Sequence, residues 1–336
     1  MYEDYYGFSG MPFQLTPDNR FFFGSEEHSK AMAFLQYGIA QQEGFVVVTG
    51  EIGAGKTTLV EHLLANLETS KFAAVRVVTT QLGGYDLLSV IAAAFGVGSD
   101  GVDKGTLIER VKQQFVDLWA RDRRPLVIVD EAQSLTTEAV EELRMLSNLS
   151  VGSHAPFQGI LLGQPEFRAV LSRPNLEQFR QRVIASCHLG ALSPVDTRHY
   201  IEYRLTQVGW TNDPLFSDSA FDEIFRCTNG IPRRINTLCS RLLLLGFLEG
   251  KHTIEATQVV GVAREMENEL GPLTTVGTSR PPMDTQNSDV GAENCGQSED
   301  MLLRLVRVER ATERHDRAIS RVLELALKYL PAQISK

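Results

Sequence analysis

Eight residues near the start of the chain carry the clearest chemical pattern. They run from Gly50 to Thr57, read GEIGAGKT and satisfy GxxxxGK[ST]. In this pattern the glycines let backbone N–H groups wrap phosphates, and the next helix directs its positive dipole end at them. We expect Lys56 to neutralise the β and γ phosphates and Thr57 to ligate magnesium. The residues expected to cradle the nucleotide are Gly50, Glu51, Ile52, Gly53, Ala54, Gly55, Lys56, Thr57 and Thr58.

A second pattern places two carboxylates after an apolar run. Residues 126–129 read LVIV and are followed directly by Asp130 and Glu131. This is the form of a Walker B strand, from which Asp130 would hold magnesium and Glu131 would polarise the attacking water. General-base assistance to water indicates hydrolysis rather than phosphoryl transfer to a second small molecule. The alternative is that the acidic pair caps the following helix.

The elements around these motifs alternate between strand and helix patterns. This alternation predicts an α/β fold, in which a parallel sheet of five strands carries helices on both faces. The expected strands span 45–49, 73–78, 126–129, 157–162 and 183–189. The expected helices span 25–42, 58–67, 85–95, 106–120 and 138–149.

From Ser193 the pattern indicates helices only, at 194–208, 217–227, 232–248 and 255–269. We therefore expect an aromatic leader (1–24) packed on a nucleotide-binding domain (25–191), followed by a small all-helical lid domain (192–270). Residues 271–300 lack large apolar side chains and periodicity, which is typical of a disordered linker. Residues 301–330 predict an amphipathic helix. It would bind a partner, form a weak coiled coil, or fold back onto the body.

Composition narrows the classes of function. The 336 residues are 43% apolar and contain no run of the roughly 20 apolar residues that a membrane span needs. The acidic, aromatic N-terminus differs from a secretory signal, so we expect a cytoplasmic protein, peripheral at the inner membrane at most through partners. A net charge of −9 disfavours broad binding to nucleic acid without excluding a local basic patch.

Strand order, motif spacing and the helical lid together resemble an AAA+ ATPase over residues 1–270. The resemblance implies ATP and Mg²⁺ as cofactors and Gln164, after the strand ending at Leu162, as the sensor 1 residue. It also implies an arginine that completes the neighbouring subunit's site, for which we prefer Arg182 over Arg180. Either arginine could instead solvate a helix end or pair with a surface carboxylate. The segment GIPRRIN resembles a sensor 2 element, with Arg233 the better match and Arg234 in reserve.

Longer segments of the sequence indicate one type of ATPase within the AAA+ class. The leader YYGFSGMPFQLTPDNRFFFGSEEH, the segment EGFVVVTGEIGAGKTTL, the DEAQSL box, GQPEF and GIPRRIN resemble ATPases of the general-secretion-pathway protein A type. Within that group the chain most resembles the ATPase of exopolysaccharide loci associated with PEP-CTERM and exosortase. The resemblance implies that Pro12, Phe13 and the region to His28 pack near the adenine, with ordinary hydrophobic packing as the alternative. Such proteins typically continue through a membrane span into a peptidoglycan-binding region, which is not expected here.

These patterns lead to one functional hypothesis and two alternatives. The resemblance implies a homo-oligomer that is reshaped by ATP binding and reset by hydrolysis. Its C-terminal helix would couple this cycle to envelope or polysaccharide-export proteins. The first alternative is an ATP-dependent DNA-binding regulator of the transposition or initiator type, which would show steeply salt-sensitive DNA binding. The second is a scaffold that binds ATP without appreciable turnover.

Overall fold

The structure is a computed structural model that describes residues 1–16, 18–78, 81–150 and 155–270. The linker expected at 271–300 and the helix expected at 301–330 lie outside the described residues. Within the described part, no helix is both long and apolar enough to cross a membrane.

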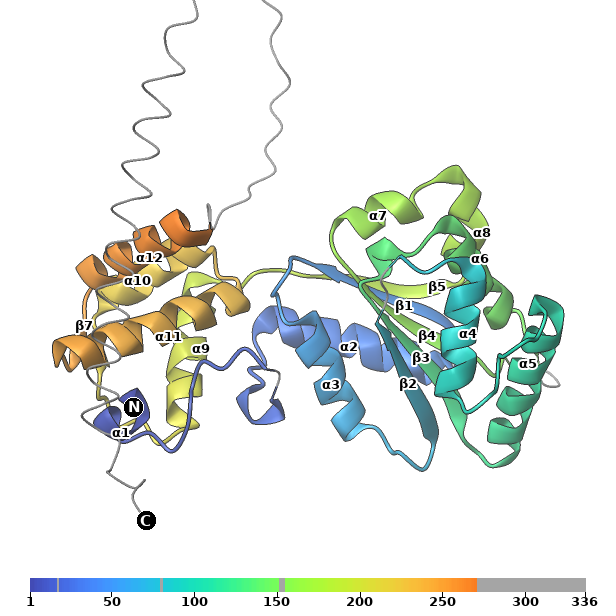
Figure 1. The fold of residues 1–336 in the computed structure, drawn as a ribbon, viewed down its shortest axis with the longest axis horizontal. Helices are drawn as coiled ribbons and strands as arrows, with labels where there is room; N and C mark the ends of the chain where they lie inside the picture. The colour runs from blue at the N-terminus through green and yellow to red at the C-terminus, as the bar shows by residue number, and fades with distance from the viewer. Residues whose placement is uncertain (17, 79–80, 151–154, 271–336) are drawn as a thin grey trace, which may run out of the picture. The chain divides into compact units, whose positions relative to one another are not determined.

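A five-stranded parallel sheet, with strand order β2-β3-β4-β1-β5, forms the first part of the fold (Figure 1). The order puts β1, which leads into the GEIGAGKT loop, between β4 and β5. It also puts β3, which ends in the acidic pair, between β2 and β4. The strands are β1 (Gly44–Gly50), β2 (Phe72–Val78), β3 (Arg124–Asp130), β4 (Gln158–Gly163) and β5 (Val183–Leu189).

Helices cover both faces of this sheet, as the sequence predicts. Because side chains alternate along a strand, Val46 and Val48 of β1 face one layer while Phe45 and Val47 face the other. The first layer holds α2 (Glu26–Gln41) and α3 (Lys56–Asn66). The second holds α4 (Gly84–Ala94), α5 (Lys104–Ala120) and α6 (Thr137–Ser147). Figure 1 shows the two layers on opposite sides of the strands.

Short helices that the sequence did not predict connect β4 to β5. They are α7 (Glu166–Leu171), a 3-10 turn (Pro174–Leu176) and α8 (Glu177–Arg180). Phe167 and Phe179 anchor them in the sheet's core, where both side chains are fully buried. Each helix is too short to develop a clear period in the sequence.

The second part of the fold, which we call the lid, is mainly helical. Ser193 and Ser217 cap the first two of its helices through their hydroxyl oxygens, which accept backbone N–H groups. The expectation of helices alone was wrong, because β6 (Leu215–Phe216) pairs in parallel with β7 (Thr253–Ile254). A strand of two residues is too short to show the alternation of apolar and polar side chains by which strands are predicted. The helices are α9 (Pro194–Thr206), α10 (Asp218–Thr228), α11 (Pro232–Glu249) and α12 (Ala256–Leu270).

Most of the aromatic leader packs on the lid, and only its last part contacts the nucleotide-binding domain, on which the whole leader was expected to pack. It begins with a short helix, α1 (Tyr2–Tyr6), and its rings share an apolar cluster with α9 and α11. The buried leader residues of this cluster are Tyr2, Tyr6, Phe8, Phe13 and Phe21. The next residue, Phe22, turns toward the sheet and stacks on His62 of α3, with ring centroids 3.9 Å apart. The apolar faces of α9 and α11 thus have the leader as their cover.

Candidate functional site

The loop between β1 and α3 has the backbone geometry that an anion site requires. Gly53 and Gly55 adopt φ angles of 84° and 98°, a region that residues with a Cβ rarely occupy. Gly55 occupies the N-cap position of α3 and supplies no side-chain cap. The first N–H groups of α3 are therefore without a capping side chain and face the loop. This is the arrangement that binds phosphate at a helix N-terminus.

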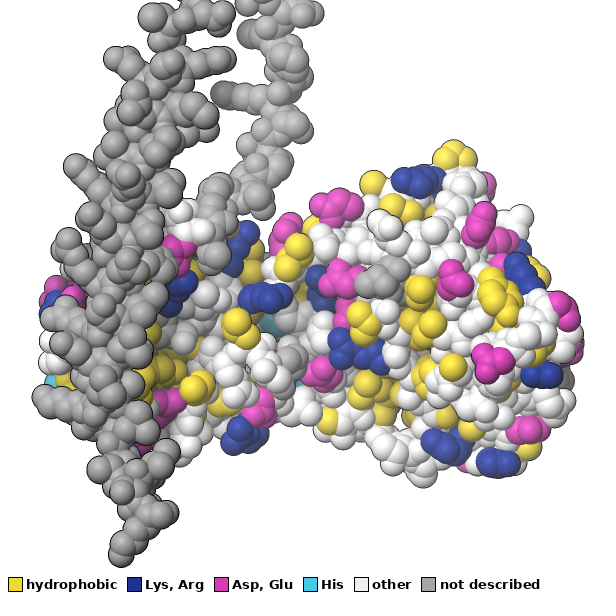
Figure 2. Space-filling model, viewed as in Figure 1, with side chains coloured by type: hydrophobic (Ala, Val, Ile, Leu, Met, Phe, Trp, Pro, Cys, Tyr) yellow, Lys and Arg dark blue, Asp and Glu magenta, His cyan; other side chains and the backbone are white. Residues whose placement is uncertain are grey.

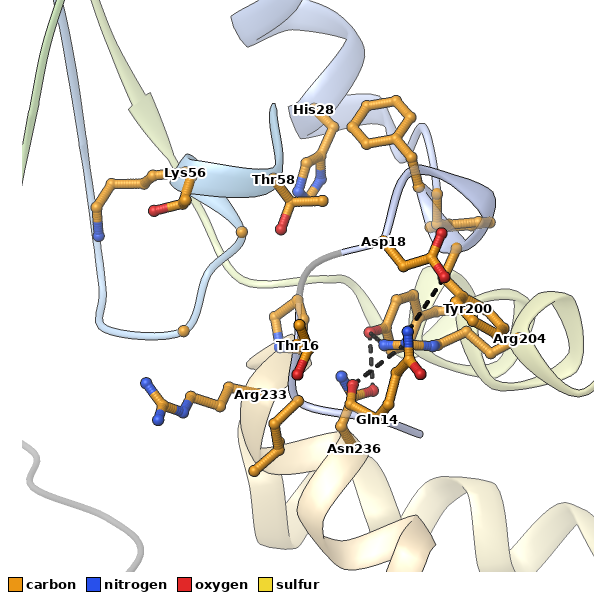
Figure 3. Close-up of a pocket in the computed structure, with 18 of the residues that line it drawn as sticks. Gln14, Thr16, Asp18, His28, Lys56, Thr58, Tyr200, Arg204, Arg233 and Asn236 are labelled. Carbon is orange, nitrogen blue, oxygen red and sulfur yellow. Dashed lines mark hydrogen bonds between the residues drawn. The ribbon is translucent and has the colours of Figure 1, made fainter. Parts of the chain in front are cut away.

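Lys56 places its amine inside this loop. The side chain is buried, and Nζ donates hydrogen bonds to the carbonyl oxygens of Gly50 at 2.7 Å and Glu51 at 2.9 Å. Burial lowers the pKa of the Lys56 amine, and the nearby carboxylates of Glu131 and Asp130 oppose that shift. Its stem follows the loop at the edge of the cleft (Figure 3). The loop thus holds the positive charge of Lys56 beside the N-terminus of α3, where an anion would bind.

Thr57 and Asp130 provide oxygen ligands suited to magnesium. The Thr57 hydroxyl donates to Oδ2 of Asp130 at 3.0 Å, and the Asp130 side chain is almost fully buried at the end of β3. Among the described residues no group of three or more His, Cys, Asp or Glu side chains could hold a metal. Mg²⁺ at nucleotide sites usually takes one or two carboxylates together with substrate phosphates and water. The pair therefore fits the ion, which when bound would neutralise charge on the phosphates.

Glu131 is held at the start of the turn after β3. Its backbone lies in the left-handed region, with φ of 55°, which directs the side chain away from the strand. Its Oε2 atom accepts hydrogen bonds from the amides of Gln133 at 2.5 Å and Gln164 at 3.3 Å. Gln164 follows the neighbouring strand β4, so the strand order brings the expected base and the expected sensor 1 residue together.

Gln133 is a site residue that the sequence reasoning quoted within DEAQSL but did not assign. Its amide nitrogen donates to Glu131, while its Oε1 atom accepts the backbone N–H of Gln164 at 2.9 Å. One side chain therefore links the ends of β3 and β4 around the Glu131 carboxylate. The available signal was an amide side chain two residues after the acidic pair.

Gln133→Leu is expected to lower the turnover number for ATP by about ten- to a hundredfold with little change in nucleotide affinity. Glu131 would lose the shorter of the two amide hydrogen bonds to its Oε2 atom, and small misplacements of a catalytic group cost this much. Steady-state hydrolysis and equilibrium binding of a fluorescent nucleotide measure the two quantities. Gln113→Leu, at an exposed position of α5, is the control. A large loss of affinity with unchanged turnover would contradict a positioning role.

Arg182 and Arg180 lie at the opposite end of the sheet from the loop. The backbone carbonyl of Arg182 accepts the N–H of Phe45, so it sits where β1 and β5 begin, while Gly50 and Leu189 end them. Six residues of strand separate the two ends, about 20 Å at 3.3 Å per residue. Arg182 is exposed, and its Nη2 atom donates to Asn148. Arg180 instead donates to the carbonyls of Leu171 and Arg173.

A cleft of about 320 Å³ is lined by the loop, the leader and the lid. Arg233 reaches it from the first turn of α11, and its backbone N–H donates to the carbonyl of Gly53 at 3.2 Å. A Cβ on Gly53 would lie 2.4 Å from that of Arg233, so only glycine permits this approach. The expected site residues that line the cleft are Ile52, Gly53, Gly55, Lys56, Thr57, Thr58, Glu131 and Arg233. Gly50, Ala54 and Asp130 are buried and are not part of the cleft lining.

The far wall of the cleft is a network that the sequence reasoning missed. Buried Arg204 of α9 donates to the hydroxyl of Tyr200 at 2.7 Å and to the carbonyl of Gln14 at 3.4 Å. Its guanidinium lies 4.6 Å from the centre of the Phe21 ring, and Tyr200 donates in turn to Asn236 at 2.8 Å. Figure 3 shows these side chains across the cleft from Lys56. Arg204 thus ties the leader to the lid where both line the cleft.

The leader contributes residues beyond Phe13 to this cleft. Phe13 is buried in the lid's apolar cluster, and the lining begins at Gln14 and continues through Phe23 to His28. The Nδ1 atom of His28 forms a hydrogen bond with Ser25 Oγ at 2.7 Å. The Nε2 atom of the same ring lies close to Gly55. Burial lowers the pKa of the His28 imidazole, opposed by a hydrogen bond to the backbone of Ala54. The start of α2 therefore supports the loop through the contacts of His28 with Ala54 and Gly55.

Comparison with known proteins defines the class. Residues 39–171 match the AAA domain family. The Pyrobaculum aerophilum Cdc6p structure aligns with a TM-score of 0.58 at 13% identity, covering 74% of this chain and 71% of that one. The Aeropyrum pernix ORC2 structure with ADPNP and ADP aligns at 0.55 and 18%, covering 71% and 67%. Both likenesses concern the fold. The chain therefore carries an AAA-type P-loop ATPase domain, a class that uses ATP together with Mg²⁺.

A sequence relative is more specific. The chain is similar to general secretion pathway protein A of Aeromonas hydrophila, with 38% identity over 256 residues. The aligned region is 76% of this chain and 46% of that protein, so the chain spans less than half the length of the relative it matches. Within the aligned region the chain is thus similar in sequence to a secretion-pathway A protein.

Proposed function

We propose that this ATPase works as a homo-oligomer whose cycle of ATP binding and hydrolysis drives the assembly or export of exopolysaccharide at the cell envelope. The observation that carries the envelope role is the 38% identity to a general secretion pathway protein over most of this chain. In this assignment Lys56 binds the phosphates, Thr57 and Asp130 hold magnesium, and Glu131 activates water. Gln164 senses the γ phosphate and Arg233 reaches the nucleotide from the lid.

The position of Arg182 supports the oligomer. Its site lies about 20 Å along the strands from the loop of its own subunit, too far for an arginine side chain to span. It is exposed, at the end of the sheet where β1 and β5 begin, so a second copy could reach it. An arginine supplied in trans stabilises charge in the transition state of phosphoryl transfer. Arg180 is bound to two backbone carbonyls and is the weaker candidate.

Mixing two inactive variants tests this arrangement. Arg182→Ala retains its own nucleotide site, while Glu131→Gln retains its arginine. In a one-to-one mixture about a quarter of the interfaces unite an intact site with an intact arginine, as expected for random partners in a closed oligomer. Hydrolysis should recover to roughly that fraction of wild type, and mass measurement should give one oligomeric species. Recovery that is absent although the variants co-assemble would contradict action in trans.

The envelope role is tested in cells of the source organism. Replacing the native gene with the Glu131→Gln form should stop the appearance of extracellular polysaccharide, because a trapped ATP state halts the cycle. Glu138→Gln, an exposed carboxylate on α6, is the matched control. Unchanged polysaccharide with a non-hydrolysing protein would overturn the proposal.

The DNA-binding alternative has a distinct outcome. ORC and Cdc6 structures share the fold at 18% identity or less. On the face shown in Figure 2, acidic and basic side chains of the described residues are interspersed rather than gathered by sign. ATP-dependent binding of duplex DNA that weakens steeply with salt would favour that alternative.

A further inference from the structure

Arg76 joins the proposed magnesium ligand to a second carboxylate. It lies on the edge strand β2, where it pairs with Ile128 of β3, two residues before Asp130. Its Nη2 atom is 2.7 Å from Oδ2 of Asp130, and its Nη1 atom is 3.0 Å from Oε1 of Glu61 on α3. The arginine thus bridges the acidic end of β3 and the helix that follows the phosphate loop.

The contact falls on the carboxylate that would hold the metal. Oδ2 of Asp130 also accepts the Thr57 hydroxyl at 3.0 Å, and Oδ1 accepts the backbone N–H of Glu131. A guanidinium at 2.7 Å from Oδ2 neutralises the Asp130 carboxylate and fills space beside it. Mg²⁺ and its water shell would need the same negative charge and the same space. The two cations therefore compete for one buried carboxylate.

The surroundings suit an exchange of one cation for the other. The Asp130 side chain is only 6% exposed, and a buried carboxylate without a cation is strongly disfavoured. The Arg76 and Glu61 side chains are 35% and 32% exposed, so the guanidinium can swing toward solvent while keeping its second partner. Glu61 is thus a ready acceptor for an arginine that leaves Asp130.

We propose that Arg76 is an internal counter-ion that holds Asp130 in the absence of magnesium and is withdrawn onto Glu61 when Mg-nucleotide binds. This inference rests on the proposed assignment of Asp130 and Thr57 to magnesium. It makes the metal requirement adjustable: the stronger the hold of Arg76 on Asp130, the more Mg²⁺ is needed to complete the site.

Two substitutions should act in opposite directions. Arg76→Gln removes the competitor and should lower the Mg²⁺ concentration for half-maximal nucleotide binding by about two- to fivefold, the range of one partly exposed ion pair. Glu61→Gln removes the alternative partner and should raise that concentration by about the same factor. Arg76→Lys keeps the charge and should stay near wild type. Arg110→Gln, on α5, is the control for loss of a surface arginine.

The Mg²⁺ concentration for half-maximal nucleotide binding can be measured without hydrolysis. The full chain is mixed with mant-ADP in the absence of metal, and the fluorescence of bound mant-ADP is followed as Mg²⁺ is added. Thermal melting of each variant checks folding. An Arg76→Gln protein with weaker mant-ADP binding at every Mg²⁺ concentration would overturn the proposal, because the arginine would then serve the phosphates. So would unchanged half-saturation in Glu61→Gln. A wild type that binds mant-ADP through Lys56 yet ignores Mg²⁺ would instead refute the magnesium assignment itself.

Discussion

Replacing Lys56 with methionine should reduce ATP binding by a hundredfold or more and leave no measurable hydrolysis. The methionine side chain matches the buried lysine stem, so the loop keeps its packing while the cation that meets the phosphates is lost. Losing one preorganised donor to developing charge typically costs a hundred- to a thousandfold. Equilibrium binding of mant-ATP and phosphate release measure the two effects.

Lys30→Met on α2 is the matched control, because that amine is exposed and pairs with Glu26 and Glu27. It should bind and hydrolyse ATP as wild type does. Thermal melting distinguishes a lost ligand contact from a lost fold. A folded Lys56→Met protein with wild-type affinity would show that the loop does not hold the phosphates through this lysine.

The second large effect is expected for Glu131→Gln. The change keeps the shape of the side chain but removes the carboxylate that would accept a proton from water, a role that contributes about a hundred- to ten-thousandfold. ATP binding should remain within a few-fold of wild type, so the variant should accumulate bound ATP rather than ADP. Chromatography of the nucleotide recovered from the filtered protein gives the ratio of bound ATP to bound ADP directly.

Glu138→Gln again serves as the control, since it removes a carboxylate from the exposed face of α6. The result that would contradict the assignment is a Glu131→Gln protein that binds ATP and still hydrolyses it at more than about a tenth of the wild-type rate. The general base would then lie elsewhere in the cleft. Loss of binding together with hydrolysis would mean that Glu131 helps to hold the nucleotide.

The sheet and its helices could be predicted because their signals are local. The apolar run 126–129 marks a buried strand by itself, and Ser25 marks the start of α2 with a hydrogen bond to the His28 N–H. The helix after the loop begins at Lys56 rather than at 58, because Gly55 in the left-handed region provides its N-cap. That difference of two residues places Lys56 in the first turn of the helix.

The missed features depend on contacts between distant segments. The hydrogen bond from Gln164 to Glu131 follows from the adjacency of β3 and β4, which no local pattern specifies. The leader packs on the lid because its rings meet α9 and α11 about 180 to 240 residues further along the chain. Arg204 could not be assigned for the same reason, since its partner Gln14 lies 190 residues away.

The leader's packing has a consequence for how the chain is made. Tyr2, Tyr6 and Phe8 are synthesised long before the lid residues that bury them, which extend to Met266. Until then these rings must remain uncovered or make temporary contacts, since domains fold as their segments become available. The sheet can complete its core once β5 has been synthesised. The leader therefore packs in place after the sheet has formed, and the cleft wall closes only once the lid has been synthesised.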